Sequence, residues 1–202
     1  MNKNVNLLAI SYVFGFTAAT ITVFLGAIIG SQITSIKSLA TLPVAFSVVG
    51  TAICTILAAK VMSKIGRRLG FIFAALVSSA AALGAAVAIY QQNFILFCIS
   101  NLILGMGMAF THQYRFAAAE SVEKEKAPKA ISILMLSGIV AAFLGITSSN
   151  YTKNLVSDHL YVGSYLLLAA FTFMPAIFLF FYKDNETTKT ELNNKYLSLI
   201  HI

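Results

Sequence analysis

Residues 59–68 read Ala-Lys-Val-Met-Ser-Lys-Ile-Gly-Arg-Arg and hold four of the fourteen cationic residues of the chain. The stretch separates two apolar runs, residues 42–62 and 70–90. Each run is long enough to cross a bilayer, because a helix needs about 20 apolar residues to span a hydrocarbon core of ~30 Å. The stretch therefore predicts a tight turn in water at Gly66, with Arg67 and Arg68 at its rim. On local features alone, these cations equally suit ordinary anchors of a cytoplasmic loop.

The whole chain has the composition of an integral membrane protein. Of its 202 residues, 58% are hydrophobic and 10% are charged, whereas soluble chains average about 25% charged residues. Because open sheets leave backbone groups unpaired in lipid, we expect every apolar run to be a helix. The predicted fold class is an all-α membrane protein with six transmembrane helices, at residues 7–30, 42–62, 70–90, 94–118, 130–149 and 161–182.

The charges of the connecting segments predict the orientation in the membrane. One side receives Lys3, the cluster at 60–68, the loop at 120–129 and the segment after residue 182, whereas the other side receives only Lys37 and Lys153. Basic loops face the cytoplasm, so we expect both termini there and the protein in a bacterial inner membrane. The net charge of +7 is spread over these loops, which argues against a nucleic-acid partner.

The spacing of the six runs suggests an internal repeat. The midpoints of the first three recur in the last three with an offset of about 90 residues, and three is an odd number of spans. The two copies would therefore lie inverted in the membrane, as two three-helix repeats. Six evenly spaced helices would give a similar offset by chance.

The stretch at 59–68 resembles the loop between the second and third spans of the major facilitator superfamily, Gly-x-x-x-Asp-(Arg/Lys)-x-Gly-(Arg/Lys)-(Arg/Lys). Lys64, Gly66, Arg67 and Arg68 agree with this pattern, whereas Ala59 replaces its first glycine and Ser63 its aspartate. In that family the acidic residue helps to hold the two halves of a transporter together on the cytoplasmic side. A serine carries no charge, so the resemblance implies a weaker gate here.

The resemblance implies that residues 1–182 form the amino-terminal six-span half of a twelve-span transporter. Such a protein would carry a small polar or anionic solute across the membrane by alternating access. Its partners would be the lipid bilayer, the solute, and a missing carboxy-terminal half or a second copy. Residues 183–202 are polar and are predicted to be a disordered cytoplasmic tail or a truncation junction. The alternative is a six-span accessory or dimerising protein without transport activity.

Polar residues of the fourth and first spans are the candidates for lining a central cavity. At 100° per residue, Met108, His112 and Arg115 lie within about 40° of Asn101 and share its face of the helix. Arg115 would attract a polar or anionic group from this face, or else extend to the lipid headgroups. Thr17 and Thr20 of the first span would face the same cavity, or bond their own helix backbone.

Carboxylates are missing from all six predicted spans, so His112 is the only titratable candidate for proton coupling there. A motif of proton-coupled exporters in the family, Arg-x-x-Gln-Gly-x-Gly, resembles residues 101–107 in its two glycines, but Asn101 and Leu104 replace the arginine and the glutamine. This departure argues against drug/proton exchange.

The remaining signals concern packing rather than chemistry. Gly105, Gly107, Gly138 and Gly145 are predicted to let helices approach closely. Cys54 and Cys98 fall within spans and read as small core residues. No nucleophile motif and no cluster of metal ligands is present, so we expect neither an enzyme nor a cofactor or metal site.

Overall fold

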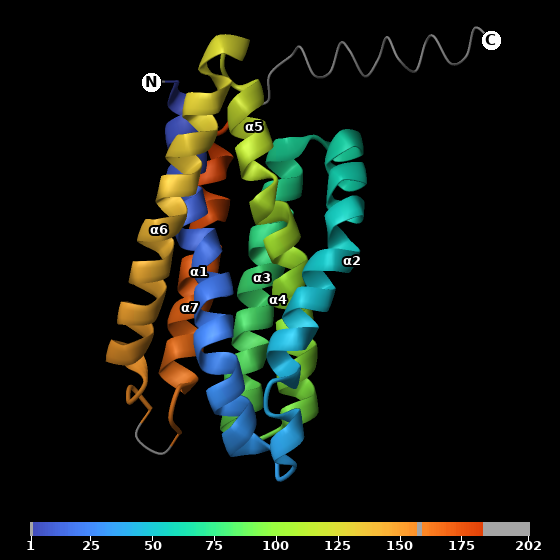
Figure 1. Ribbon diagram of the computed structural model, residues 1–202, viewed down its shortest axis with the longest axis vertical. Coiled ribbons are helices and arrows are strands. Elements are labelled where there is room, and N and C mark those ends of the chain that lie inside the picture. Colours follow the sequence, from blue (N-terminus) through green and yellow to red (C-terminus); the bar gives the residue numbers. More distant parts are fainter. Residues whose placement is uncertain (1, 157–158, 184–202) are drawn as a thin grey trace, which may run out of the picture.

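A computed structural model describes residues 2–156 and 159–183, and its regular elements in this part of the chain are all helices (Figure 1). The six expected spans are confirmed as six helical segments long and apolar enough to cross a membrane. Apart from Lys183, the tail expected at residues 183–202 lies outside the described residues. In order, the elements are α1 (Lys3–Ile33), η1 (Lys37–Leu39), α2 (Leu42–Ile65), α3 (Arg67–Tyr90), α4 (Phe94–His112), α5 (Tyr114–Glu120), η2 (Lys124–Lys126), α6 (Ala127–Thr152) and α7 (Val162–Phe180).

The connection between α2 and α3 is shorter than the charged stretch at residues 59–68. Gly66 alone joins the two helices, with φ 88° and ψ 157°. Residues with a β-carbon rarely adopt such a positive φ, so glycine is required at this turn. The four cations of the stretch accordingly lie on the ends of two helices rather than on an extended loop.

The fourth span is expected as one helix but consists of two. α4 ends at His112, and α5 begins at Tyr114, after a turn at Gln113. The Phe116 amide bonds to the Gln113 carbonyl instead of continuing the regular pattern to His112. The break therefore leaves the carbonyl of His112 without its helical donor.

The helices pack as two inverted repeats, α1 to α3 and α4 to α7, with α4 and α5 together forming one span (Figure 1). Exchanging the repeats reproduces the packing: α2 lies along α4 as α6 lies along α1, and α3 lies along its own equivalent, α7. Ser79 of α3 donates a hydrogen bond of 2.9 Å to the Ala169 carbonyl of α7, 90 residues away. The offset expected from the sequence is therefore present in three dimensions.

The contact between α2 and α4 is made by backbone against backbone. A β-carbon at Gly105 would overlap the Ser47 carbonyl, and one at Gly50 would overlap the Leu102 carbonyl. The Thr51 hydroxyl bridges the two helices by donating 2.9 Å hydrogen bonds to the carbonyls of Ser47 and Gly105. Small residues and such polar bridges are what hold helices together in lipid, where apolar surface has no preference for protein.

The two equivalent helices α2 and α6 are the least enclosed. Only 22% of the apolar window of each of these spans is buried in the bundle, against 50–56% for the other four spans. The exposed apolar side chains of α6 include Leu136, Val140 and Phe143. These two helices therefore present most of the surface that lipid or another protein segment would cover.

We predict that Gly105→Ala lowers the melting temperature of the chain in detergent, because the new methyl group would push α4 away from Ser47. Overpacking of this kind costs about 1–3 kcal/mol. Gly84→Ala is the matched control, since its β-carbon would meet only the movable Ser100 hydroxyl at 3.1 Å. Equal melting temperatures for the two variants would show that the α2–α4 contact is not tight.

Candidate functional site

Two aromatic rings of α1 form one side of the candidate site. Tyr12 and Phe16 are one helical turn apart, and their rings stack with centroids 5.1 Å apart and planes 12° from parallel. Gly138 of α6 lies directly opposite, because a β-carbon there would be 3.3 Å from the Tyr12 ring. Glycine thus lets α6 pass close to the stacked pair. Tyr12 is buried, whereas Phe16 stays half-buried.

The other side of the site carries polar groups from α4 and α5. The His112 ring meets the Phe16 ring edge to face, with centroids 5.8 Å apart and an interplanar angle of 70°. The positive charge of Arg115 acts on both Tyr12 and His112. We define Tyr12, Phe16, His112, Arg115 and Gly138 as the aromatic–cation patch. It combines flat apolar surface with a fixed positive charge, a combination suited to a planar polar ligand.

The break between α4 and α5 determines where Arg115 lies. Its Nε donates a 3.1 Å hydrogen bond to the carbonyl of His112, the group that the break leaves without a helical donor. A free carbonyl is costly in a membrane, so the guanidinium satisfies the helix end. Its carbon lies 5.6 Å from the centroid of the Phe116 ring. Arg115 is half-buried and keeps further donors for a ligand.

Two of the residues expected at the cavity lie elsewhere. Asn101 and Thr17 have no exposed surface, so the expectation that they face an open cavity needs correction. Asn101 donates from Nδ2 to the Phe97 carbonyl at 2.8 Å, and Thr17 donates to the Phe14 carbonyl at 2.6 Å. Both side chains are used by their own helices, which is the alternative considered for the threonines.

Asn101 instead belongs to a polar group inside the bundle. Tyr165 of α7 lies next to both Asn101 of α4 and Thr22 of α1, so that the three helices converge there. Each of the three side chains leaves one buried oxygen without a hydrogen bond of standard geometry among the described residues. Polar contacts between helices of this kind hold membrane bundles together, and this group lies in the interior, away from the aromatic–cation patch.

The other two residues expected at the cavity, Met108 and Thr20, are half-buried and contact neighbouring helices. Met108 is half-buried beside the apolar core formed by α1, α3, α4 and α7. Thr20 donates to the Thr17 carbonyl at 3.0 Å and contacts α6, where a β-carbon at Gly145 would overlap its hydroxyl. The remaining packing glycine, Gly107, lies against Ser78 of α3. Of the predicted stripe, the structure brings only His112 and Arg115 together with the aromatic pair.

An ion pair links the stretch at 59–68 to α5. Arg67 forms a 2.5 Å ion pair with Glu120, and the two side chains are 21% and 43% exposed. The Ser63 hydroxyl donates to the Lys60 carbonyl of its own helix at 2.8 Å, so it does not link α2 to another element. The guanidinium carbon of Arg68 lies 4.9 Å from the Phe180 ring centroid. Ala59 and Lys64 are exposed.

Sequence reasoning missed two of these residues. Phe16 has no polar atom that marks it as a site residue, although its one-turn spacing from Tyr12 places both rings on one face. Glu120 is 53 positions from Arg67, and no local pattern pairs them. The described residues contain no group of three or more histidine, cysteine, aspartate or glutamate side chains able to hold a metal ion.

Comparison with known proteins gives one family and several relatives. The family model described as Major Facilitator Superfamily matches residues 7–197. The riboflavin transporter RfnT of Brucella anthropi is 32% identical over 187 residues, which are 93% of this chain and 47% of RfnT. The uncharacterized MFS-type transporters YddS and YdeG of Bacillus subtilis are each 26% identical, over 71% and 86% of this chain and over 33% and 41% of their own lengths. The chain thus spans less than half of each of these relatives.

We predict that the Arg67–Glu120 ion pair stabilises the chain only slightly. Arg67→Glu and Glu120→Arg should each lower the melting temperature in detergent, and the double variant should recover most of the loss. Because both groups are partly exposed, the coupling energy should be about 1 kcal/mol or less. The more exposed pair of Glu123 and Lys126 is the control and should couple more weakly. A double variant no better than the single ones would contradict the pairing.

Proposed function

The chain belongs to the Major Facilitator Superfamily, and we propose that it forms the amino-terminal half of a twelve-helix transporter that carries a small polar solute by alternating access. Its six spans form two inverted three-helix repeats, and two such halves rock about a site near the membrane midplane in transporters of this architecture. The match to less than half of each relative's length supports a second half elsewhere. The weakly buried helices α2 and α6 would then contact that half or the lipid beside it.

We further propose that the patch binds a planar, polar aromatic solute, for which riboflavin is the first candidate. The observation that carries this proposal is the stacked Tyr12–Phe16 pair next to His112 and Arg115. Rings of this kind bind the flat face of a heteroaromatic ligand, and the guanidinium donates to carbonyl or anionic groups at its edge. A relative that is 32% identical is a riboflavin transporter, which supports this solute among the polar or anionic ones.

We propose that the end of the bundle carrying the α2–α3 turn faces the cytoplasm of a bacterial cell. Ten of the twelve described lysine and arginine residues belong to this half of the bundle, and the opposite end has Lys37 and Lys153. Such a bias is the usual signature of the cytoplasmic side. At that end, Ala59, Ser63, Lys64, Gly66, Arg67 and Arg68 would form the gate. With Ser63 in place of an acid, Glu120 supplies the carboxylate that holds Arg67.

The alternative is a six-helix protein that functions without a second half, as an accessory subunit or as a dimer. Mass measurement of the native protein in detergent separates the two cases. A single polypeptide with six further spans supports the transporter, whereas an assembly of 202-residue chains favours the alternative.

We predict that Arg115→Ala abolishes solute transport by the complete protein without reducing its amount in the membrane. The substitution removes the only cation of the patch and the donor to the His112 carbonyl. Transport of radiolabelled riboflavin into cells or vesicles would measure the effect. Lys153→Ala, which removes one half-buried cation at the opposite end, is the control and should transport normally. Normal transport by Arg115→Ala would remove this residue from the site.

We predict that Phe16→Leu raises the KM for riboflavin by about 2- to 12-fold, because an aromatic pair contributes about 0.5–1.5 kcal/mol beyond its buried area. Phe14→Leu is the matched control on the same helix, since the Phe14 ring packs against Phe171 and Phe178 of α7 instead. Equal KM values for the two variants would mean that the solute does not stack on Phe16. If riboflavin is not transported, a panel of other polar solutes tests the transporter proposal separately.

A further inference from the structure

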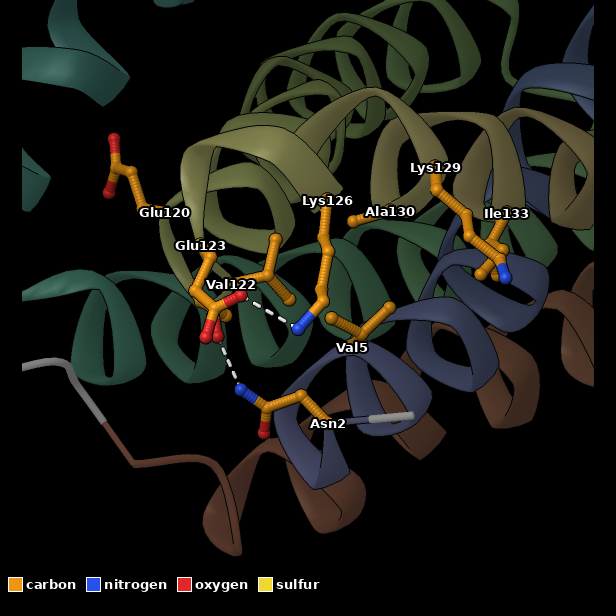
Figure 2. A pocket seen from close by; sticks show the side chains of 10 residues that line it. Asn2, Val5, Glu120, Val122, Glu123, Lys126, Lys129, Ala130 and Ile133 are labelled. Carbon is orange, nitrogen blue, oxygen red and sulfur yellow. Dashed lines mark hydrogen bonds and ion pairs between the residues drawn. The ribbon is translucent and has the colours of Figure 1, made fainter.

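A pocket at the basic end of the bundle lies apart from the aromatic–cation patch. It has a volume of about 780 Å³ and opens between the start of α1, the segment after α5 and the start of α6 (Figure 2). Its polar lining includes Glu123, Lys126 and Lys129, and its apolar lining includes Val5 and Ile133. Asn2 closes one side by donating a hydrogen bond from its side chain to the Ser121 carbonyl. The pocket thus joins charged groups to an apolar wall at the boundary of the membrane.

The charges of the pocket leave a cation available. Glu120 already pairs with Arg67 outside the lining, at 2.5 Å. Lys126 pairs with Glu123 at 2.7 Å, but the two side chains are 66% and 75% exposed, so this pair is weak and easily exchanged. The hydrogen bond and the charge of Lys126 lower the pKa of Glu123. Lys129 forms no ion pair within the described part of the chain.

An apolar stripe begins directly below Lys129. Ile133, Leu136, Val140 and Phe143 follow it on α6 at spacings of four and three residues, which places all five on one face of the helix. Leu136, Val140 and Phe143 are 62%, 56% and 75% exposed. The stripe from Ile133 to Phe143 extends about 15 Å along the helix axis, which matches the ~15 Å of hydrocarbon in one leaflet. In Figure 2 the Lys129 side chain lies along Ile133.

We propose that this pocket binds the phosphate of an anionic phospholipid, with Lys129 and Lys126 on the phosphate and an acyl chain along the stripe of α6. Cations above an exposed apolar helix face match the order of charge and hydrocarbon in such a lipid, and basic pockets at membrane boundaries bind anionic headgroups. Glu120 keeps its ion pair with Arg67, whereas Lys126 would exchange its weak pair with Glu123 for the phosphate. A soluble phosphate compound has no acyl chain that could contact the stripe. This site is independent of the solute and goes beyond the proposed transport.

The proposal is tested by thermal unfolding of the full chain in detergent. Titration with dioleoylphosphatidylglycerol should raise the melting temperature, whereas dioleoylphosphatidylcholine and glycerol 3-phosphate should raise it far less. Equal effects of the two lipids would overturn the choice of an anionic headgroup. An effect of glycerol 3-phosphate as large as that of the anionic lipid would overturn a lipid as the ligand.

Variants then locate the binding. Lys126→Gln with Lys129→Gln should weaken the apparent affinity for the anionic lipid by about 25-fold, because each lysine near an anionic surface contributes about fivefold. Lys37→Gln with Lys153→Gln removes two charges at the opposite end and should leave the affinity unchanged. Lys129→Arg should also retain binding. The melting temperature of each variant with phosphatidylcholine alone shows whether it is folded. Unchanged affinity in the folded double variant at 126 and 129 would overturn the site.

Discussion

Hydrocarbon offers no hydrogen bonds, and this constraint accounts for most of the structure. Each backbone amide and carbonyl within the membrane needs a partner in its own chain, and a helix supplies one for nearly every residue. The described residues accordingly form six helical spans joined by short connections, one of which is the single residue Gly66. Where a helix is interrupted, a side chain has to supply the hydrogen bond that the backbone no longer makes. Arg115 supplies it at the end of α4 by donating to the His112 carbonyl.

The two inverted repeats share one topology, but their equivalent helix pairs pack at different closeness. The contact between α2 and α4 brings backbones together through Gly50 and Gly105 and adds a hydrogen bond from Thr51. In the equivalent contact between α1 and α6, glycines face side chains instead, with Gly138 against the Tyr12 ring. One pair therefore packs as closely as two helices can, whereas the other leaves room for rings. This difference leaves space for the Tyr12–Phe16 ring pair beside α6.

Polar side chains in the bundle differ in whether their hydrogen-bonding atoms are already used within the protein. Asn101 and Thr17 are enclosed and bonded to their own helices, so neither has surface to offer a solute. His112 is half-buried beside Phe16, and the half-buried Arg115 retains donors beyond the one it gives to the backbone. At the basic end, the weak pair of Glu123 and Lys126 remains open to exchange, and so does Lys129, which forms no ion pair with another described residue. Exposure and unused bonding capacity, rather than polarity alone, separate candidate ligand groups from structural ones.

The number of spans, the turn at Gly66 and the basic end of the bundle follow from the sequence by itself. Each depends on a local property: the length of an apolar run, the backbone freedom of glycine, or the charge of a short connection. The rotation of each helix about its axis was decided only in the tertiary structure, as were the burial of Asn101, the meeting of Tyr12 and Phe16 with His112, and the pairing of Arg67 with Glu120. In a soluble protein the polar face of a helix reveals its orientation. Lipid and protein core are equally apolar, so these helices are hydrophobic on all sides and their sequences do not show which face turns inward.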